Sequence, residues 1–290
     1  HPTGPLPPFP GQGQVPAFLR TYTADEVKER KQKLKFTKMS ACSNDYIYIN
    51  LFDEENKVSS PEFLSIYLSD RHNGVGGDGV ILICPSDKAD AQMRMFNLDG
   101  SEGWMCGNGI RCVAKYLFDN GIAKGQKVGE GRYLLHIDTK SGVKDCTVIT
   151  KNGLVSKVTV DMGRAELAPE KIPVRLEGEQ VVDKPISIGG NVYRITCCSM
   201  GNPHCTVFVP SVDKLDLQDL GPKFENDPMF PDRVNVSFVE VIDQHTLKAR
   251  IWERGSGETM ACGTGTCAAV VAATLNGYCE KGKDIRVILK

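Results

Sequence analysis

Hydrophobic and polar residues alternate along several short stretches of the chain, a pattern typical of β-strands. We expect strands over residues 46–49, 80–83, 92–96, 146–149, 158–160 and 285–289. Helical spacing is rarer, and it predicts helices over residues 61–69, 106–118 and 262–275. Many short strands with few helices predict an α+β fold rather than alternating βαβ units.

Two of these helices begin with the same motif. Glu102-x3-Cys106-Gly107-Asn108-Gly109 recurs as Glu258-x3-Cys262-Gly263-Thr264-Gly265. Two weaker pairs occur in the same order, because Asn44 is matched by Asn202, and Asp70-Arg71-x-Asn73 by Asp232-Arg233-x-Asn235. A repeat of this length indicates internal duplication, so we expect two pseudo-symmetric domains, each with one of the motifs.

The repeat also sets the expected domain boundaries. The two halves would cover residues 34–152 and 153–290, with a junction turn at residues 151–153. Residues 1–33 are rich in proline and then in charge, and we expect an extended tail followed by a short helix outside the fold.

Composition narrows the class of protein. Of the 290 residues, 41% are hydrophobic and 24% charged, with a formal net charge of -1, which is typical of a globular protein. This balance argues against nucleic acid or an acidic membrane surface as a partner. The longest apolar stretch, residues 267–275, is far shorter than the roughly 20 residues of a membrane span. Eleven cysteines without paired spacing argue against a disulfide framework and favour a reducing compartment, such as the cytoplasm.

The repeated cysteines carry the candidate chemistry. A cysteine at a helix N-terminus lies beside unpaired N–H groups and the positive end of the helix dipole, which favour the thiolate. The Gly-x-Gly that follows lets the backbone approach a ligand and direct N–H groups at a carboxylate. If the two halves face each other, Cys106 and Cys262 converge on one small molecule.

Two opposed thiols suit the inversion of a carbon centre that bears hydrogen. One base removes the proton from one face, and a conjugate acid returns a proton to the other. The carbanion of an amino acid then needs N–H donors around its carboxylate in a site that excludes water. We find no lysine motif for pyridoxal phosphate and expect no cofactor.

Other candidates have structural readings that compete with functional ones. We expect Cys42, Cys84, Cys112, Cys146, Cys197, Cys198, Cys205, Cys267 and Cys279 to be core residues, and their spacing is not that of a zinc site, so no metal is expected. Residues 74–79 lack the order of a phosphate loop and are read as a tight turn. His204 is as easily structural as functional, and Glu253-Arg254 is either a surface ion pair or a clamp for amine and carboxylate.

Three motifs together resemble the diaminopimelate epimerase family over about residues 35–290. They are Asn97-Leu-Asp-Gly-Ser-Glu-x3-Cys106-Gly-Asn-Gly-x-Arg111-Cys, Gly201-Asn-Pro-His204 and Trp252-Glu-Arg-Gly-x-Gly-Glu-x2-Ala-Cys262-Gly-Thr-Gly. The resemblance implies two β-rolls, each around a central helix, with the site between them. It also implies a pyridoxal-independent isomerase of lysine biosynthesis that interconverts LL- and meso-diaminopimelate.

The resemblance also implies roles for individual residues. Cys106 and Cys262 become the acid/base pair, with His204 and Glu253 near the thiols and setting their protonation. Backbone groups would hold the α-carboxylate, from Gly107, Asn108, Gly263 and Thr264. Side chains would contact the substrate, from Asn44, Asn97, Asn202, Asn235, Glu253 and Arg254. A homodimer is left open, and the compartment would be the cytoplasm, or the plastid stroma in a plant.

The chain departs from the family in three places. Ala41-Cys42-Ser43 replaces a glycine-rich approach to Asn44, Gly79 stands where many members have glutamine, and the chain stops at the strand over residues 285–289, where most members continue. These departures keep two alternatives open: a cofactor-independent racemase of another amino acid, such as proline or histidine, and a catalytically silent amino-acid-binding homologue.

Overall fold

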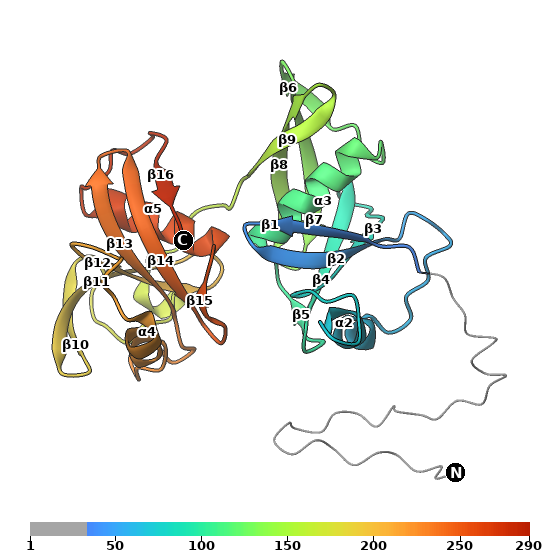
Figure 1. Ribbon diagram of the computed structural model, residues 1–290. Coiled ribbons are helices and arrows are strands. Elements are labelled where there is room, and N and C mark those ends of the chain that lie inside the picture. Colours follow the sequence, from blue (N-terminus) through green and yellow to red (C-terminus); the bar gives the residue numbers. More distant parts are fainter. Residues whose placement is uncertain (1–33) are drawn as a thin grey trace, which may run out of the picture.

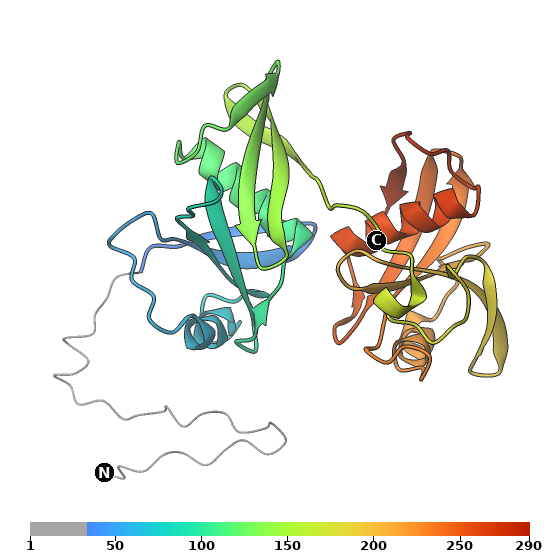
Figure 2. The ribbon, with the colours of Figure 1, turned by 180° about the vertical axis from the view of Figure 1, so that it is seen from behind.

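The computed structural model describes residues 34–290, and the tail and short helix expected over residues 1–33 lie outside them. The described chain forms two β-sheets, each with a helix on either face, so the fold is α+β (Figure 1). The sheets are linked by the segment that follows β9, and they form two lobes (Figure 2).

The first sheet has nine strands in the order β1-β2-β3-β4-β7-β8-β9, with β5 beside β4 and β6 beside β7. Neighbours pair antiparallel except β2 with β3 and β4 with β7. The strands are β1 Thr37–Ala41, β2 Asn44–Asn50, β3 Gly79–Cys84, β4 Ala91–Asn97, β5 Glu102–Gly103, β6 Gln126–Gly129, β7 Arg132–Thr139, β8 Gly142–Lys151 and β9 Leu154–Val160.

Two helices cover this sheet. α3 (Gly107–Asp119) contacts both β1 and β9, the two end strands, so the sheet curls around it. Its apolar side, which includes Ile110, Val113 and Leu117, packs into the core of the lobe. α2 (Pro61–Ser69) covers a second cluster on β2, β3 and β4. The two helices and the sheet therefore make three layers.

The second sheet has seven strands in the order β10-β11-β12-β13-β14-β15, with β16 beside β14. Only the β12–β13 and β14–β16 pairs are parallel among its described strands. The strands are β10 Lys184–Ile188, β11 Asn191–Ser199, β12 Pro203–Phe208, β13 Asn235–Asp243, β14 Thr246–Glu253, β15 Gly257–Thr259 and β16 Arg286–Ile288.

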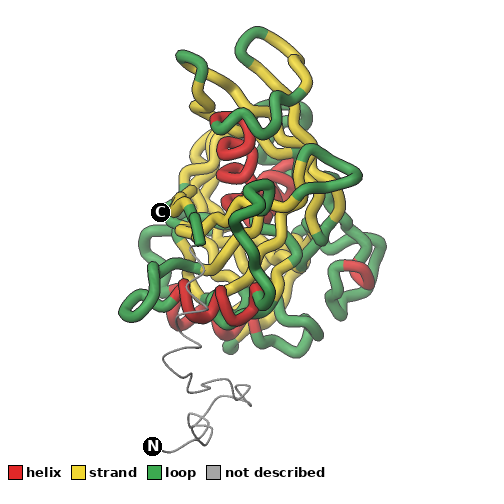
Figure 3. Tube along the Cα trace, turned by 90° about the vertical axis from the view of Figure 1, so that its right-hand side faces the viewer, coloured by secondary structure: helices red, strands yellow, loops and turns green. Residues whose placement is uncertain are grey.

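Helices again lie on both faces. α5 (Gly263–Leu275) contacts β11, β12, β13 and β14, and α4 (Leu217–Glu225) contacts β13 and β15. A short 3-10 helix, η1 (Pro169–Lys171), contacts β11. More of the described chain lies in strands than in helices, and loops join them (Figure 3). Within residues 34–290 no helix combines the length and the apolar character needed to cross a membrane.

The first sheet extends past the junction turn expected at residues 151–153. Asn152 and Gly153 have φ of 55° and 79° and join β8 to β9, with Lys151 opposite Leu154. Asn-Gly with both residues at positive φ forms the turn whose twist matches a two-residue hairpin. Residues 154–160 therefore belong to the first sheet, and the division between the sheets falls after Val160.

Candidate active site

Both repeated cysteines lie at helix N-termini. Cys106 is the N-cap of α3 and Cys262 is the N-cap of α5. Each Sγ accepts a hydrogen bond from the amide of the third residue onward, Gly109 N or Gly265 N, at 3.3 Å in both cases. A sulfur thus satisfies an N–H group that has no acceptor within its helix. The repeated motif places each thiol in the same local frame.

The last glycine of each motif allows this frame to pack on its sheet. A Cβ at Gly109 would lie 2.6 Å from Ile81 Cδ1, and one at Gly265 would lie 2.9 Å from Ile251 Cδ1. Both separations are too short for a real side chain. The first turn of each helix therefore lies directly on the sheet, and the cysteine before it is held at a fixed height.

The first glycine after each cysteine, Gly107 or Gly263, lies where the two halves meet. A Cβ at Gly263 would lie 3.6 Å from Gly107 Cα, so the two backbones meet at the first residue of each helix. The N-termini of α3 and α5 face each other there (Figure 1). Each carries roughly half a positive charge. We call this meeting point the seam, and it favours an anion.

The glutamate of each repeated motif forms an ion pair with an arginine on the neighbouring strand. Glu102 Oε1 accepts from Arg94 Nε at 2.7 Å, and Glu258 Oε1 accepts from Arg250 Nε at 2.8 Å. In each lobe the arginine precedes the glutamate by the same spacing and lies on the neighbouring strand. The glutamates of the motif are therefore ion-pair partners, and the two arginines complete a larger repeat than sequence inspection found.

Burial dominates the protonation of both thiols. It raises the pKa of Cys106, although the amides of Gly109 and Asn108 lower it. Burial and the charge of Glu253 raise the pKa of Cys262 to about 12. The amide N–H groups favour the thiolate, as expected, but removing the sulfur from water costs more than these groups return. Burial therefore holds the pKa of both thiols above the ordinary value of a cysteine.

Glu253 lies beside both thiols. Its charge raises the pKa of Cys262 and also that of Cys106 in the opposite lobe. Its Oε1 accepts a hydrogen bond from Thr259 Oγ1 at 2.5 Å. The carboxylate is held at the end of β14, close to the seam, where it can pair with an ammonium group.

His204 reaches the second thiol indirectly. Its Nε2 lies 3.0 Å from Asn202 Oδ1, Asn202 Nδ2 donates to Thr264 Oγ1 at 3.4 Å, and Thr264 Oγ1 lies 3.4 Å from Cys262 Sγ. The ring is fully buried, which lowers the pKa of His204 to about 3. A neutral imidazole fits the donation to Asn202, and its Nδ1 has no partner among the described residues.

The first lobe has a matching contact. Asn108 Nδ2 donates to Asn44 Oδ1 at 2.6 Å, as Asn202 contacts Thr264 in the second lobe. Asn108 Nδ2 also donates to Ala261 O at 3.2 Å, so this amide hydrogen-bonds across the seam to the residue before Cys262. The asparagine pair found by the repeat therefore lies at equivalent places in the two lobes.

Asn235 and Arg254 form the wall beside His204. Asn235 is buried, donates through Nδ2 to Pro203 O at 2.8 Å and accepts from Arg254 N at 3.0 Å. The Arg254 side chain donates to Asp232 O at 2.8 Å. The Glu253-Arg254 pair expected as one option at the surface is not formed among these contacts, because the guanidinium is held by a carbonyl group.

Asn97 ends β4, and its Nδ2 donates to Ser101 Oγ at 3.0 Å. Within residues 34–290 no side-chain hydrogen bond joins Asn97 to either cysteine. The structure therefore leaves the Asn97 side chain apart from the hydrogen-bond network around the seam.

Tyr46 is a site residue that sequence inspection missed. Its hydroxyl hydrogen-bonds the Cys106 thiol and lowers the pKa of that thiol, and the side chain is buried. The signal was present, because Tyr46 follows Asn44 by two residues as His204 follows Asn202. The repeat therefore pairs a tyrosine with one thiol and a histidine network with the other.

The remaining cysteines are all free thiols. Cys42 is exposed rather than buried as expected, because it lies in the two-residue turn between β1 and β2. Cys84 and Cys267 are half-buried, and the other core cysteines are buried. Within residues 34–290 no group of three or more His, Cys, Asp or Glu side chains could hold a metal ion.

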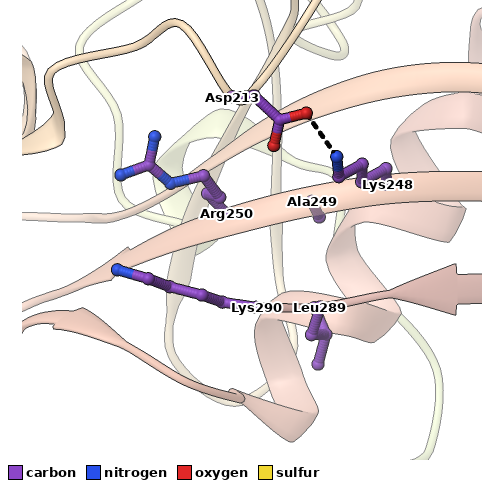
Figure 4. Close-up of a pocket in the computed structure, with 6 residues that line it drawn as sticks. All are labelled: Asp213, Lys248, Ala249, Arg250, Leu289 and Lys290. Atoms are coloured by element: carbon purple, nitrogen blue, oxygen red, sulfur yellow. Dashed lines mark hydrogen bonds and ion pairs between the residues drawn. The ribbon is translucent and has the colours of Figure 1, made fainter.

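A pocket of about 300 Å³ lies elsewhere, beside β14 and the last residues of the described chain (Figure 4). Its charges are paired, since Lys248 contacts Asp213 at 2.5 Å, and both Arg250 and Lys290 contact Glu258. It contains neither cysteine. The seam, and not this pocket, holds the candidate chemistry.

Comparison with known proteins agrees with the geometry. The family model described as diaminopimelate epimerase matches residues 36–168 and 196–290. Curated diaminopimelate epimerases from Acetivibrio thermocellus and Desulfovibrio desulfuricans are 47% and 48% identical to this chain. The first alignment covers 88% of each chain, and the second covers 89% of this chain and 88% of the other.

Solved structures share the architecture at low sequence identity. A probable proline racemase from Agrobacterium radiobacter and a hydroxyproline epimerase from Agrobacterium vitis each match with a TM-score of 0.60 at 15% identity. Each match covers 89% of this chain and 82% of the other. At this identity the likeness shows the fold and nothing about the substrate.

Proposed function

Since this chain belongs to the diaminopimelate epimerase family, an isomerase family of lysine biosynthesis, we propose that Cys106 and Cys262 are the two bases of its reaction. The observation that carries this proposal is the seam, where two thiols from different lobes lie at facing helix N-termini. Each thiol would act on its own face of the α-carbon, one removing a proton and the other returning one.

The α-carboxylate of diaminopimelate would bind at the seam. The N–H groups of the first helical residues have no acceptor within their helices, and those of Gly107, Asn108, Gly263 and Thr264 are the expected donors. As the proton leaves, negative charge spreads into this carboxylate. The two helix N-termini then stabilise the charge where it develops, which lowers the barrier.

Substrate binding would place a positive charge near the thiols and lower the pKa of one of them. The carboxylate of Glu253 raises the pKa of Cys262. An α-ammonium group that pairs with Glu253 would cancel this effect and add an attractive positive charge. The pKa of one thiol would then fall, and a thiolate would form only when substrate is present.

The other expected contacts complete the site. We assign Asn44, Asn97, Asn202, Asn235 and Arg254 to the polar groups of the substrate. His204 orients Asn202 through the hydrogen bond described above. The Asn235 amide is bonded to backbone groups at both ends and keeps one N–H and one oxygen lone pair for the substrate.

Two further expectations remain proposals. We place the enzyme in the cytoplasm, or in the plastid stroma in a plant, because eleven free thiols suit a reducing compartment. A homodimer, which the sequence leaves open, is the assembly that we propose, and sedimentation of the full chain would give its mass directly.

The test is proton NMR of LL-diaminopimelate with the reduced enzyme in D2O, without added pyridoxal phosphate. The α-proton signal should disappear as the meso form appears. Cys106→Ala and Cys262→Ala should each lose about 10²–10⁴-fold in rate. Cys84→Ala is the matched control, because that thiol lies at the end of β3 and should leave the rate unchanged.

The outcomes test the substrate and the two-base mechanism separately. Absence of exchange with the unmodified enzyme would rule out the substrate, and a silent homologue or a racemase of proline or histidine would be tested next with those amino acids. Full activity of either alanine variant would remove the two-base mechanism while keeping the family activity.

A further inference from the structure

A chain of hydrogen bonds runs through the first lobe to the seam. Arg111 Nη2 donates to Asn108 Oδ1, and Asn108 Nδ2 donates to Asn44 Oδ1 at 2.6 Å. Asn44 Nδ2 then donates to Asp78 Oδ2 at 3.2 Å. A guanidinium group stands at one end of this chain, a carboxylate stands at the other, and two amides lie between them.

The charged ends fix the direction of both amides. Arginine has only donors, so Asn108 must present its oxygen to Arg111. The carbonyl of Ala261 only accepts, so the opposite end of the same amide must be the NH2 group. An ionised Asp78 also only accepts, which fixes the NH2 group of Asn44 toward it. Every donor in the chain therefore points from Arg111 toward Asp78.

We propose that Arg111 and Asp78 are positioning residues that set the amide orientation of Asn108 and Asn44 for catalysis. This inference rests on the proposed function, which assigns Asn44 and Asn108 to the substrate. Neither Arg111 nor Asp78 needs to touch the substrate. Their effect passes through the two amides, which would otherwise rotate between two states of similar shape.

The orientation decides what the substrate meets. Asn108 uses both N–H bonds of its amide, one toward Asn44 and one toward Ala261. Asn44 keeps one N–H and one oxygen lone pair free for a ligand. If Asn108 were flipped, its oxygen would face the oxygen of Ala261 and the seam would lose a hydrogen bond. The chain thus couples the binding amide of one lobe to the residue that precedes Cys262.

Further contacts hold Asp78 and Arg111, the two ends of this chain of hydrogen bonds. Arg71 Nη2 lies 3.1 Å from Asp78 Oδ1, and Asp45 N donates to Asp78 Oδ2 at 3.0 Å. At the other end Arg111 Nη2 also contacts Cys42 Sγ at 3.2 Å. Asn108 is buried, whereas Arg111 and Asp78 are half-buried, so the ends are accessible to substitution without opening a large cavity.

A double-mutant cycle between the two ends tests the proposal. Arg111→Ala and Asp78→Asn should each lower kcat/KM for diaminopimelate by about 10–100-fold, the range seen when groups behind a site are lost. The kcat/KM of the double variant should be no lower than that of the less active single variant, because either change already frees both amides. Groups that share no partner would instead show multiplied losses.

Two controls define the effect. Arg111→Lys keeps one donor for Asn108 and should restore most of kcat/KM. Arg194→Ala removes an exposed ion pair with Asp183 in the second lobe and should change neither activity nor the effect of Arg111→Ala. Multiplied losses in the double variant, or full activity of Arg111→Ala, would overturn the proposal.

A measurement without turnover separates this proposal from the function. In ¹⁵N-labelled enzyme without substrate, the side-chain NH2 resonances of Asn108 and Asn44 should both move in Arg111→Ala and in Asp78→Asn. In Arg194→Ala they should stay in place. If both resonances move but the unmodified enzyme has no turnover, the proposed function is wrong while the positioning role of Arg111 and Asp78 is supported. If only the amide next to each substitution moves, the positioning role is overturned.

Discussion

His204 is a fully buried imidazole on β12, and the guanidinium of Arg254 lies near it. Both features lower the pKa of His204, to about 3 from an ordinary value near 6.5. Because the native state resists a proton that the unfolded state accepts, this residue couples stability to pH. It does so in the mildly acidic range, where the carboxylates are still ionised.

The sign follows from the two pKa values. Above pH 6.5 both states hold a neutral ring and the residue has no pH effect. Below pH 6.5 the unfolded state is protonated first, so the free energy of unfolding should fall by about 2 kcal/mol between pH 7 and pH 5 through this residue alone. Urea unfolding at the two pH values measures the change.

Two substitutions isolate this contribution. His204→Gln keeps an amide donor for Asn202 and should lose about 2 kcal/mol less than the unmodified enzyme between pH 7 and pH 5. His72→Gln changes an exposed ring and should behave as the unmodified enzyme does. Equal pH dependence in the enzyme and in His204→Gln would contradict the buried neutral ring.

At the scale of elements, α4 shows how tertiary contacts override local preference. Its sequence includes Gly221 and Pro222, both poor helix formers in isolation. The helix forms because Asp216 caps it, accepting from the amides of Gln218 and Asp219, and because Gly221 lies directly on the ring of Trp252. Packing, rather than propensity, stabilises this helix.

The contact with Trp252 gives a test. A Cβ at Gly221 would lie 2.1 Å from Trp252 Cδ2, so Gly221→Ala should lower the free energy of unfolding by about 1–3 kcal/mol despite the better helix propensity of alanine. In a Trp252→Ala background the ring atoms that the added Cβ would meet, Cδ2, Cε3 and Cγ, are gone, and the same change should cost clearly less. Equal losses in the two backgrounds, measured by urea unfolding, would show that the ring is not the obstacle.

The elements that sequence inspection predicted share a clear local pattern. The helix expected over residues 61–69 and those beginning at the two cysteines are confirmed within one or two residues, because apolar runs follow a proline or a glycine-rich start. In the second lobe, most strands escaped detection. Buried polar residues such as Thr196, Thr206 and Ser237 interrupt their hydrophobic alternation.

The site shows the same division. The duplicated motif singled out Cys106 and Cys262, which the structure brings to facing helix ends. Sequence inspection did not identify the roles of Arg111 and Asp78. Their contacts depend on how the turn at Cys42-Ser43 and the loop before β3 fold against α3, and no spacing along the chain encodes that. The raised pKa of the two thiols could not be predicted from the sequence either, since their burial depends on how the whole lobe folds.

At the scale of the whole molecule, the seam makes the enzyme sensitive to oxidation. Cys106 and Cys262 directly precede Gly107 and Gly263, whose backbones are in contact, and both thiols must approach one carbon atom. Hydrogen peroxide should therefore convert the two thiols to one disulfide with release of two water molecules. Activity should be lost and should return with dithiothreitol.

Mass spectrometry of tryptic peptides identifies the bond. A peptide pair joining Cys106 to Cys262 is expected after oxidation, and diaminopimelate should protect against its formation. Cys106→Ser should give no such pair. If the oxidised enzyme loses no activity and contains no cross-linked pair, the two thiols do not come close enough to react with each other.

Within residues 34–290 the chain passes from one sheet to the other once, after Val160, and no strand of this part is shared between them. Each lobe is thus a contiguous polypeptide with its own core. A polypeptide cut within residues 161–165 would leave both sheets whole, so the two fragments could be made separately and recombined. The same layout means that a single ancestral lobe, paired with a second copy of itself across such a seam, would already have presented two opposed cysteines before the gene was doubled.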